Sequence, residues 1–284
     1  MAFTTRFAPS PTGQLHLGHA YSALLAHDMA RAAQGRFLLR IEDTDNTRCT
    51  PAFEAQIYDD LAWLGLTWET PVLRQSDNTA AYDAALDRLG EMDLLYPCRC
   101  TRADIRRAAS APQEGAPMHG PDGVIYPGTC RNRRWEDRTD TDAVRLNMAR
   151  ATDGLTTLPH YTETGIHPAL RLTRAHLTDE VGDIVLARRD TKTAAYHLSV
   201  VVDDAAQDIT HVIRGEDLAT ATPIHVLLQA LLGLPTPIYH HHRLIRDEHG
   251  KRLAKRDDAR AIALYRAEGA TPQDIRGMVG LTTA

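Results

Sequence analysis

The stretch Thr4-Thr-Arg-Phe-Ala-Pro-Ser-Pro-Thr-Gly-Gln-Leu-His-Leu-Gly-His19 decides the fold that we expect for this chain. Residues 4–8 are typical of a short strand, which the prolines and glycine of residues 9–13 end because they forbid regular structure. Residues 16–33 carry apolar side chains at intervals of three and four, which predicts an amphipathic helix. The apolar run 37–41 indicates a buried parallel strand. Together they predict a βαβ unit, and therefore an α/β fold that binds ligands at its strand ends.

Beyond this unit, similar patterns predict further helices and strands. Helices are expected at 51–64, 78–92 and 220–232, and strands at 144–148, 184–187, 198–202 and 238–239. Two short helices separated near Gly269 are expected after residue 259. Between residues 97 and 134 the composition shifts to Gly, Pro, Arg and Cys, which predicts an inserted subdomain with little core of its own.

Composition excludes several classes of protein. The 284 residues, 43% hydrophobic and 24% charged, are typical of an ordinary globular protein. The net charge of −5 excludes a globally basic nucleic-acid binder but permits a local basic face. No apolar run is long enough for a membrane span or a signal core, so we expect a cytoplasmic protein without membrane contact. Four cysteines in such a chain make no disulfide framework.

The loop that opens the first helix has the chemistry of a phosphate site. The chain contains neither G-x-x-x-x-G-K-[ST] nor G-x-G-x-x-G, and instead offers His16-Leu-Gly-His19 after the proline-rich turn. Backbone N–H groups and the helix dipole attract anions there, and Gly18 lets a nucleotide approach. His16 and His19 share a helix face and can donate to phosphate oxygens. A bare H-x-x-H is more often two surface histidines, but the preceding buried strand and turn favour the phosphate site.

These residues resemble the glutamyl branch of the class I aminoacyl-tRNA synthetases. Residues 6–13 followed by 16–19 match that branch, including its HIGH signature, and residues 40–45 and 213–218 extend the match. Residues 252–256, Arg-Leu-Ala-Lys-Arg, look like a degenerate KMSKS loop. The resemblance implies a Rossmann-like parallel sheet, an inserted zinc-binding subdomain of the acceptor type and a short helical C-terminal tail.

The resemblance also implies a division of the chain. The catalytic domain would consist of residues 1–96 and 183–242, interrupted by the insert at 97–182, and residues 243–284 would form the KMSKS-like loop and a helical stem region. A full glutamyl-tRNA synthetase carries a large anticodon-binding region after that loop. We expect none here, because the sequence ends soon after Lys255. The expectation is therefore a truncated, monomeric paralogue of the glutamyl-tRNA synthetases.

Such a paralogue implies a ligase reaction in two steps. The enzyme would activate L-glutamate with ATP and Mg²⁺, without tRNA, to glutamyl-adenylate. It would then transfer glutamate to the queuosine base in the anticodon loop of tRNA(Asp), and not to a tRNA 3′ end. Three alternatives stay open: a catalytic domain that charges a 3′ end with a separate partner, a ligase that loads a carrier protein, and an inactive regulatory RNA-binding paralogue.

The family motifs imply which residues bind ATP and which carry the reaction. His16 and His19, beside Gly18, would stabilise the reacting phosphates, since two negatively charged reactants must be aligned and neutralised. Lys255 would hold the departing pyrophosphate as a point charge. The family has lysine and serine where Arg252 and Ala254 stand here, so charge is kept at the first position and a hydroxyl is lost at the third.

The glutamate pocket is expected at the end of the first strand. An acidic amino acid needs a fixed cation, and the arginine fork matches a carboxylate bidentately. By resemblance, Arg6 and Arg214 would supply that cation, Glu42 would receive the ammonium group, and the Tyr196 hydroxyl would line the pocket. The full set of expected glutamate-binding residues is Arg6, Phe7, Ala8, Pro9, Ser10, Glu42, Tyr196 and Arg214.

The cysteines of the insert point to a structural metal. Cys98, Cys100 and Cys130 bracket a Gly/Pro-rich loop, and structural zinc sites favour thiolates in a tetrahedron of four ligands. Three cysteines do not complete that tetrahedron. The resemblance implies Tyr126 as the fourth ligand, while His119 is the chemically commoner alternative. Free thiols without metal are the remaining interpretation.

Overall fold

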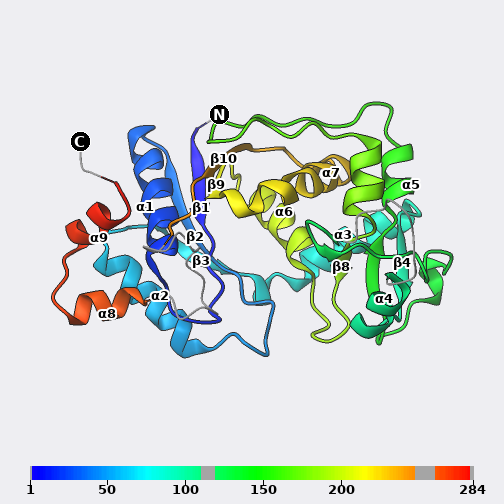
Figure 1. Cartoon of the computed structure of the whole chain (residues 1–284), viewed down its shortest axis with the longest axis horizontal. Coiled ribbons are helices and arrows are strands. Elements are labelled where there is room, and N and C mark those ends of the chain that lie inside the picture. The colour runs from blue at the N-terminus through cyan, green and yellow to red at the C-terminus, as the bar shows by residue number, and fades with distance from the viewer. Residues whose placement is uncertain (1, 110–118, 247–259, 282–284) are drawn as a thin grey trace.

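The expected βαβ unit forms one end of a parallel sheet in the computed structural model, which describes residues 2–109, 119–246 and 260–281. Strand β1 (Thr4–Phe7) pairs in parallel with β2 (Arg36–Ile41), and helix α1 (Leu17–Ala32) connects them. Strand β3 (Glu69–Arg74), which no sequence pattern indicated, pairs in parallel with the other edge of β2. The predicted α/β class with a parallel sheet is confirmed (Figure 1).

A second parallel pair adjoins β1. Strand β9 (His211–Gly215) pairs with β10 (Ile238–His242), and the Thr210 N–H donates to the Thr4 carbonyl (3.0 Å). Strands β2 and β3 therefore follow on one side of β1, while β9 and β10 lie on its other side. This reversal is a topological switch point, where open α/β sheets bind their ligands.

Two hydrophobic cores support the sheet. One lies between the sheet, α1 and α2 (Pro51–Trp63), and includes Leu24, Leu39 and Leu61. The other lies around α3 (Thr79–Glu91), α6 (Tyr196–Ala206) and α7 (Thr222–Leu232). Figure 1 shows α6 and α7 between the sheet and the insert. Short helical turns η1 to η4 occupy Gln75–Asp77, Trp135–Asp137, His176–Val181 and Glu216–Ala221.

Residues 198–202 are helical, so the strand predicted there is wrong. A short apolar run does not distinguish a buried strand from a buried helix by periodicity alone. Leu198, Val200 and Val201 are all buried, because α6 packs against α3, α7 and β8. This packing overrides the low helix propensity of the β-branched valines.

The insert is built on an antiparallel sheet at the opposite end of the molecule from the C-terminus (Figure 1). Its strands are β4 (Leu95–Cys98), β7 (Ala143–Leu146) and β8 (Val185–Ala187), in the order β4-β7-β8. The sheet thus includes residues on both sides of the expected insert, 97–182. A two-residue hairpin and two short helices complete it: β5 (His119–Gly120), β6 (Gly123–Val124), α4 (Arg102–Ala109) and α5 (Met148–Asp153).

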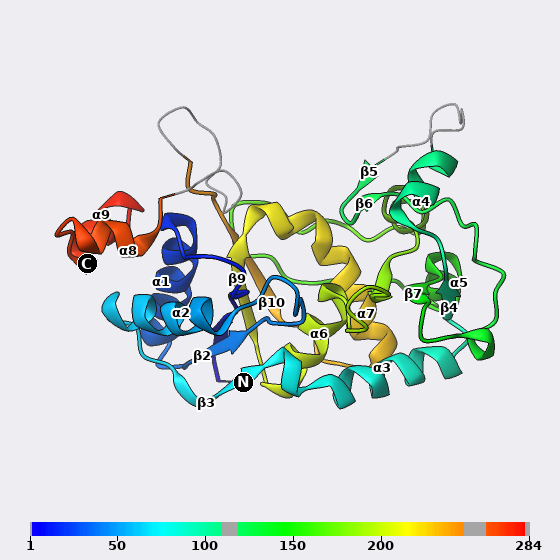
Figure 2. The same cartoon turned by 90° about the horizontal axis from the view of Figure 1, so that it is seen from below.

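Helices α8 (Ile262–Ala267) and α9 (Pro272–Met278) follow the segment that the structure does not describe. They lie beside α1 and α2 in both views (Figures 1 and 2). The Arg276 guanidinium contacts Asp28 of α1 at 2.7 Å, and the Ile262 N–H donates to the Leu15 carbonyl (2.8 Å). In the described segments, no helix has both the length and the apolar character needed to cross a membrane.

Candidate active site

A cavity of about 550 Å³ lies at the carboxyl ends of β1, β2 and β9, next to the start of α1. It has the position that the topological switch point predicts. The cavity brings together all the expected glutamate-binding residues and the histidine pair: Arg6, Phe7, Ala8, Pro9, Ser10, His16, Gly18, His19, Glu42, Tyr196 and Arg214. Lys255 and the other residues of the KMSKS-like loop lie outside the described residues.

The start of α1 fixes both histidines. His16 is the N-cap residue, and its Nδ1 accepts the Gly18 N–H, while His19 Nδ1 accepts the His16 N–H (both 3.1 Å). Because both Nδ1 atoms are acceptors, each neutral ring carries its proton on Nε2. The ring centroids are 3.8 Å apart. The pair is therefore suited to donate to neighbouring oxygens of a phosphate chain.

Gly18 packs against the His16 ring, a contact that the sequence did not predict. A Cβ atom at position 18 would lie 3.0 Å from Cε1 and 3.1 Å from Nδ1 of the His16 ring. Such contacts are tighter than most real Cβ contacts, so a side chain at position 18 would push the imidazole by a few tenths of an ångström. Glycine at position 18 therefore helps to hold the His16 ring in place.

Arg6, at the end of β1, is held by Asp204 of α6. Its Nε and one terminal nitrogen donate to the two carboxylate oxygens at 2.8 and 3.3 Å, and Arg40 donates to the same carboxylate at 2.7 Å. Burial opposes ionisation of Asp204, but the two guanidinium charges outweigh it and hold its pKa below the ordinary value. Arg6 is thus a fixed cation in the cavity wall, as recognition of a substrate carboxylate requires.

Glu42, just after β2, places a carboxylate at the cavity. Arg40 donates to its Oε1 at 3.1 Å. Burial raises the pKa of Glu42 even though Arg40 and Arg6 oppose that rise. A cation placed in the cavity would favour the ionised form again. The side chain is therefore suited to receive an ammonium group.

Arg214, at the end of β9, is held from three sides. Its Nε donates to His241 Nε2 (3.1 Å), one terminal nitrogen lies 3.0 Å from His225 Nδ1, and the other donates to the Thr222 hydroxyl (2.7 Å). Only 6% of Arg214 is exposed, yet it lines the cavity. A guanidinium held this firmly loses little conformational entropy when it binds a carboxylate.

Tyr196 and Ser10 complete the wall of the cavity. The Tyr196 ring packs edge-on against His197 and His225, with centroids 5.6 Å away in each case. Burial raises the pKa of Tyr196, so its hydroxyl stays protonated and able to donate. Ser10 lies near Cys49, with Oγ and Sγ 3.9 Å apart.

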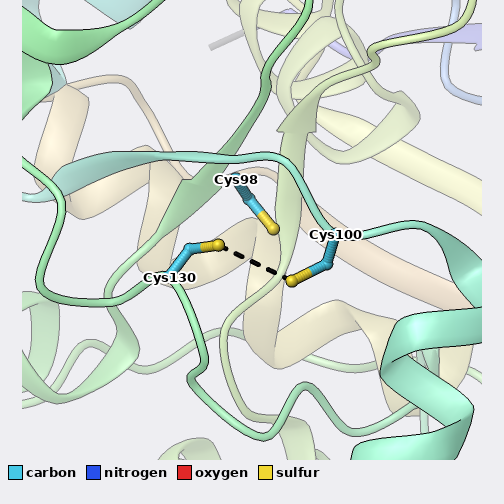
Figure 3. Close-up of side chains that lie close together, drawn as sticks. All are labelled: Cys98, Cys100 and Cys130. Carbon is cyan, nitrogen blue, oxygen red and sulfur yellow. Dashed lines mark hydrogen bonds between the residues drawn. The ribbon is translucent and has the colours of Figure 1, made fainter.

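The three cysteines of the insert converge at a second site. Figure 3 shows the thiols of Cys98, Cys100 and Cys130 turned toward one another, and their Sγ atoms all lie within 4.8 Å of one another. Cys100 and Cys130 sulfurs are 3.6 Å apart, close to the spacing of about 3.8 Å in a tetrahedral zinc site. The Tyr126 Oη lies 3.3 Å from Cys98 Sγ and 3.4 Å from Cys100 Sγ.

The donor set at this second site fits zinc better with Tyr126 than with His119. Oη of Tyr126 lies beside the sulfurs, and the Arg145 guanidinium lies 3.9 Å from its ring centroid. Burial raises the pKa of the Tyr126 hydroxyl, so a bound metal ion would be needed to hold it as a phenolate. Among the described residues, no histidine or carboxylate joins the three cysteines in a candidate metal group. His119, in β5, is exposed.

The family follows from a comparison with known sequences. The model of the class I tRNA synthetase catalytic domain, E and Q type, matches residues 2–283. The chain belongs to this family. It is 60% identical to the Glutamyl-Q tRNA(Asp) synthetase of Rhodobacter capsulatus over 284 residues, which cover 98% of this chain and 99% of that protein. It is 42% identical to the protein of the same name from Nocardia farcinica, over 96% and 82% of the two chains.

Solved structures agree with the family. A glutamate-tRNA synthetase from Elizabethkingia anophelis superposes with a TM-score of 0.75 at 26% identity, over 99% of this chain. This chain spans 61% of that synthetase. Methionyl-tRNA synthetase of Mycobacterium tuberculosis, at 12% identity and a TM-score of 0.63, shares the fold. The predicted resemblance is confirmed: the chain has the class I synthetase catalytic fold and is a ligase of that type.

A larger cleft of about 1360 Å³ meets the cavity at Tyr196 and Asp217. One wall belongs to the segment after β2 and the other belongs to the insert. Its lining contains both arginines and aspartates: Asp45, Arg48, Arg102, Arg106, Asp122, Arg145, Asp183, Arg188, Arg189, Asp190 and Asp217. The insert therefore adds charged groups of both signs to the approach to the cavity.

Sequence reasoning missed the side chains that hold the two arginines in place. Asp204 and Arg40 fix Arg6, while His225 and His241 fix Arg214. One signal was available, since an arginine inside the apolar run 37–41 requires a buried acidic partner. The identity of that partner was hidden, because it lies more than 160 residues away along the chain.

Proposed function

We propose that this chain activates L-glutamate with ATP, without tRNA, and transfers the glutamate to the queuosine base in the anticodon loop of tRNA(Asp). The cavity carries the proposal, because it joins two fixed arginines and a half-buried carboxylate to the His16–His19 pair. The printed names of the relatives, which describe Glutamyl-Q tRNA(Asp) synthetases, support the choice of RNA.

In the first step, an oxygen of the glutamate α-carboxylate attacks the α-phosphorus of ATP. The bond between the α-phosphorus and the bridging oxygen breaks, pyrophosphate leaves, and glutamyl-adenylate forms. Arg6 and Arg214 would bind the side-chain carboxylate and Glu42 the ammonium group, so that the α-carboxylate faces the phosphates. His16 and His19 would donate from Nε2 to phosphate oxygens, and Lys255 would neutralise the leaving pyrophosphate. Mg²⁺ bound to ATP would supply further charge neutralisation.

In the second step, a hydroxyl of the queuosine base attacks the carbonyl carbon of glutamyl-adenylate. The mixed anhydride bond breaks, AMP leaves with the electron pair, and the hydroxyl proton passes to solvent or to AMP. The cleft beside Tyr196 gives an RNA loop a route to the cavity, and its arginines can contact phosphates. Zinc held by Cys98, Cys100, Cys130 and Tyr126 would be structural, since it would tie β4 to the loop before β7.

The decisive experiment asks which nucleotide receives the amino acid. The protein is incubated with ATP, labelled glutamate and tRNA(Asp) that contains queuosine, and the 3′-terminal adenosine is then removed. Label retained on the RNA supports the proposal. Label lost with the adenosine contradicts it and favours the charging of a 3′ end.

A second assay separates activation from transfer. Exchange of pyrophosphate into ATP is measured with glutamate and without tRNA. Exchange supports a tRNA-independent enzyme, while no exchange and no transfer together indicate an inactive paralogue. tRNA(Asp) with guanosine in place of queuosine is the matched RNA control and should accept no label.

A further inference from the structure

Arg214 takes part in a continuous chain of hydrogen bonds that leads away from the cavity. Its Nε donates to His241 Nε2 (3.1 Å), and His241 Nδ1 lies 2.5 Å from Oε2 of Glu163. His241 is 1% exposed, and the Glu163 side chain is 2% exposed. Neither lines the cavity, so this pair acts on a ligand only through the arginine.

The donors and acceptors in this chain fit together in one way only. Arginine has no acceptor, so His241 must present an unprotonated Nε2 to Arg214. A neutral imidazole with a bare Nε2 carries its proton on Nδ1, and that proton is donated to Glu163. The carboxylate thus selects the tautomer of His241 that can accept from Arg214.

Electrostatics keep both partners in the required state. Burial, reinforced by the charge of Arg214, lowers the pKa of His241 to about 4, so the ring is neutral at physiological pH. Burial opposes ionisation of Glu163, but hydrogen bonds from the backbone and ring of His241 and from the backbone of Gly165 outweigh it. These bonds hold the pKa of Glu163 below its ordinary value, and the carboxylate is ionised.

Backbone hydrogen bonds hold both the side chain of Glu163 and the segment that carries it. Oε1 of Glu163 accepts the N–H groups of Gly165 (2.7 Å) and His241 (3.0 Å). The flanking residues pair with β10, since the Thr164 N–H donates to the Tyr239 carbonyl (2.9 Å). A Cβ atom at Gly165 would overlap the backbone of His241, so the close approach of the two segments depends on this glycine.

We propose that Glu163 and His241 are positioning residues that hold the Arg214 guanidinium in the orientation that binds the substrate's carboxylate. The proposal rests on the proposed function in one respect, that the carboxylate belongs to glutamate. The rest of it concerns the hydrogen bonds from Glu163 through His241 to Arg214, which form in the protein without substrate. Glu163 is not a catalytic residue, because it reaches the cavity only through His241 and then Arg214, which lines the cavity.

The test is the nearly isosteric variant Glu163→Gln. Its amide oxygen would still accept hydrogen bonds from the N–H groups of Gly165 and His241, so its NH₂ group would face His241 Nδ1. His241 would then carry its proton on Nε2, and two donors would meet at Arg214. In the pyrophosphate exchange assay, the KM for glutamate should rise about tenfold or more, and the KM for ATP should stay within about twofold.

The matched control is Glu180→Gln, the same change in a Glu–His pair in which the exposed Glu180 lies 3.3 Å from the half-buried His176. It should leave both KM values unchanged. Nitrogen-15 NMR of the histidine rings, without substrate, should report a proton on Nδ1 of His241 in the wild type and on Nε2 in Glu163→Gln. An altered tautomer with an unchanged KM for glutamate would overturn the proposal, as would an unaltered tautomer.

A second pair of variants covers the case in which Glu163→Gln fails to fold. His241→Gln keeps one donor and one acceptor and should retain the glutamate KM within about threefold, whereas His241→Leu should raise it about tenfold or more. Equal values for the two would contradict the proposal. If the wild type shows no glutamate-dependent exchange, the proposed function fails, while the NMR result still decides whether Glu163 sets the tautomer.

Discussion

At the scale of single residues, the charge of Arg6 in the cavity depends on a buried partner of opposite charge. Asp204 receives Arg6 at 2.8 Å and Arg40 at 2.7 Å, and its side chain is 6% exposed. A buried ion pair adds little net stability, but a buried charge left without its partner costs several kcal/mol. The acidic residue is therefore needed both for the fold and for the position of Arg6.

Asp204→Asn tests this dependence. Loss of the negative charge leaves the buried Arg6 guanidinium without its carboxylate, while Arg40 keeps Glu42 at 3.1 Å, so unfolding in urea at pH 7 should show a loss of about 3 kcal/mol. The KM for glutamate should also rise. Asp208→Asn, an exposed aspartate just after the same helix, is the control and should change neither quantity.

The pH dependence of this loss has a definite sign. The pKa of Asp204 is lower in the folded protein than in the unfolded chain, so the stabilising carboxylate is fully effective above the unfolded value of about 3.8. Its contribution disappears as pH falls through the folded pKa. The difference in stability between wild type and Asp204→Asn should therefore shrink below about pH 4. A difference that grows on acidification would contradict this account.

Gly18→Ala tests the contact between position 18 and the His16 ring. The new methyl group should displace the imidazole from the phosphates, so kcat for pyrophosphate exchange should fall about tenfold with little change in the KM for glutamate. Gly277→Ala is the matched control. Nothing lies within 4 Å of a Cβ atom there, and alanine in α9 should leave activity intact and add up to about 1 kcal/mol of stability. Equal activity of the two variants would disprove the role given to Gly18.

At the scale of elements, α2 places a carboxylate on its buried face. Asp60 is 2% exposed, and its Oδ2 has no hydrogen-bond partner among the described residues. Burial raises the pKa of Asp60 to about 6, although the charge of Arg266 in α8 opposes the rise. The ionised form is therefore a cost to the native state at neutral pH.

Asp60→Asn should remove that cost. Between the unfolded pKa of about 3.8 and the folded pKa of about 6, the native state binds more protons, so wild-type stability falls as pH rises. The variant should be more stable by about 1–3 kcal/mol at pH 7.5, and this advantage should vanish below about pH 4. Thermal and urea unfolding at several pH values measure it. Asp59→Asn, on the exposed side of α2, should show no such dependence.

Sequence patterns predicted helices that are half-buried better than they predicted fully buried helices or strands with distant partners. The helices at 51–64 and 78–92 are close to α2 and α3, because a half-buried helix shows its period. The run 198–202 shows none, since α6 is buried on nearly all sides. Strands β3, β4 and β9 were not predicted, because each rests on pairing with a partner that is distant along the chain.

At the scale of the whole molecule, the insert has two sources of cohesion. Its sheet shares the larger hydrophobic core with α3, α6 and α7 through residues such as Leu95, Leu146 and Ile184. Cys98, Cys130 and Tyr126 form a separate small buried cluster with Tyr96, and the partly buried Cys100 packs against it. This small cluster has little apolar burial of its own, so a bound ion would stabilise the loop before β7.

Zinc analysis of variants tests the donor set. The wild type should hold about one zinc per chain, Cys98→Ser should lose it, and Tyr126→Phe should bind it about tenfold more weakly. His119→Ala should keep zinc, since His119 lies apart from the cysteines. Zinc lost from His119→Ala but kept by Tyr126→Phe would reverse the assignment. A chelator should lower the melting temperature of the wild type.

The sequence by itself predicted the βαβ opening, the turn before α1 and eleven of the twenty described residues that line the cavity. These features are local, because strand, turn and helix cap follow from the neighbouring residues and their periodicity. Lys255 stays a prediction, since it lies outside the described residues.

Only the tertiary structure decided which groups support those side chains. Asp204 meets Arg6 across 198 positions of sequence, and Glu163 meets His241 across 78. No local pattern indicates such pairs, because they form only when β1, α6, β9 and β10 pack together. Burial then makes each pair obligatory, since a charge removed from water must have a partner.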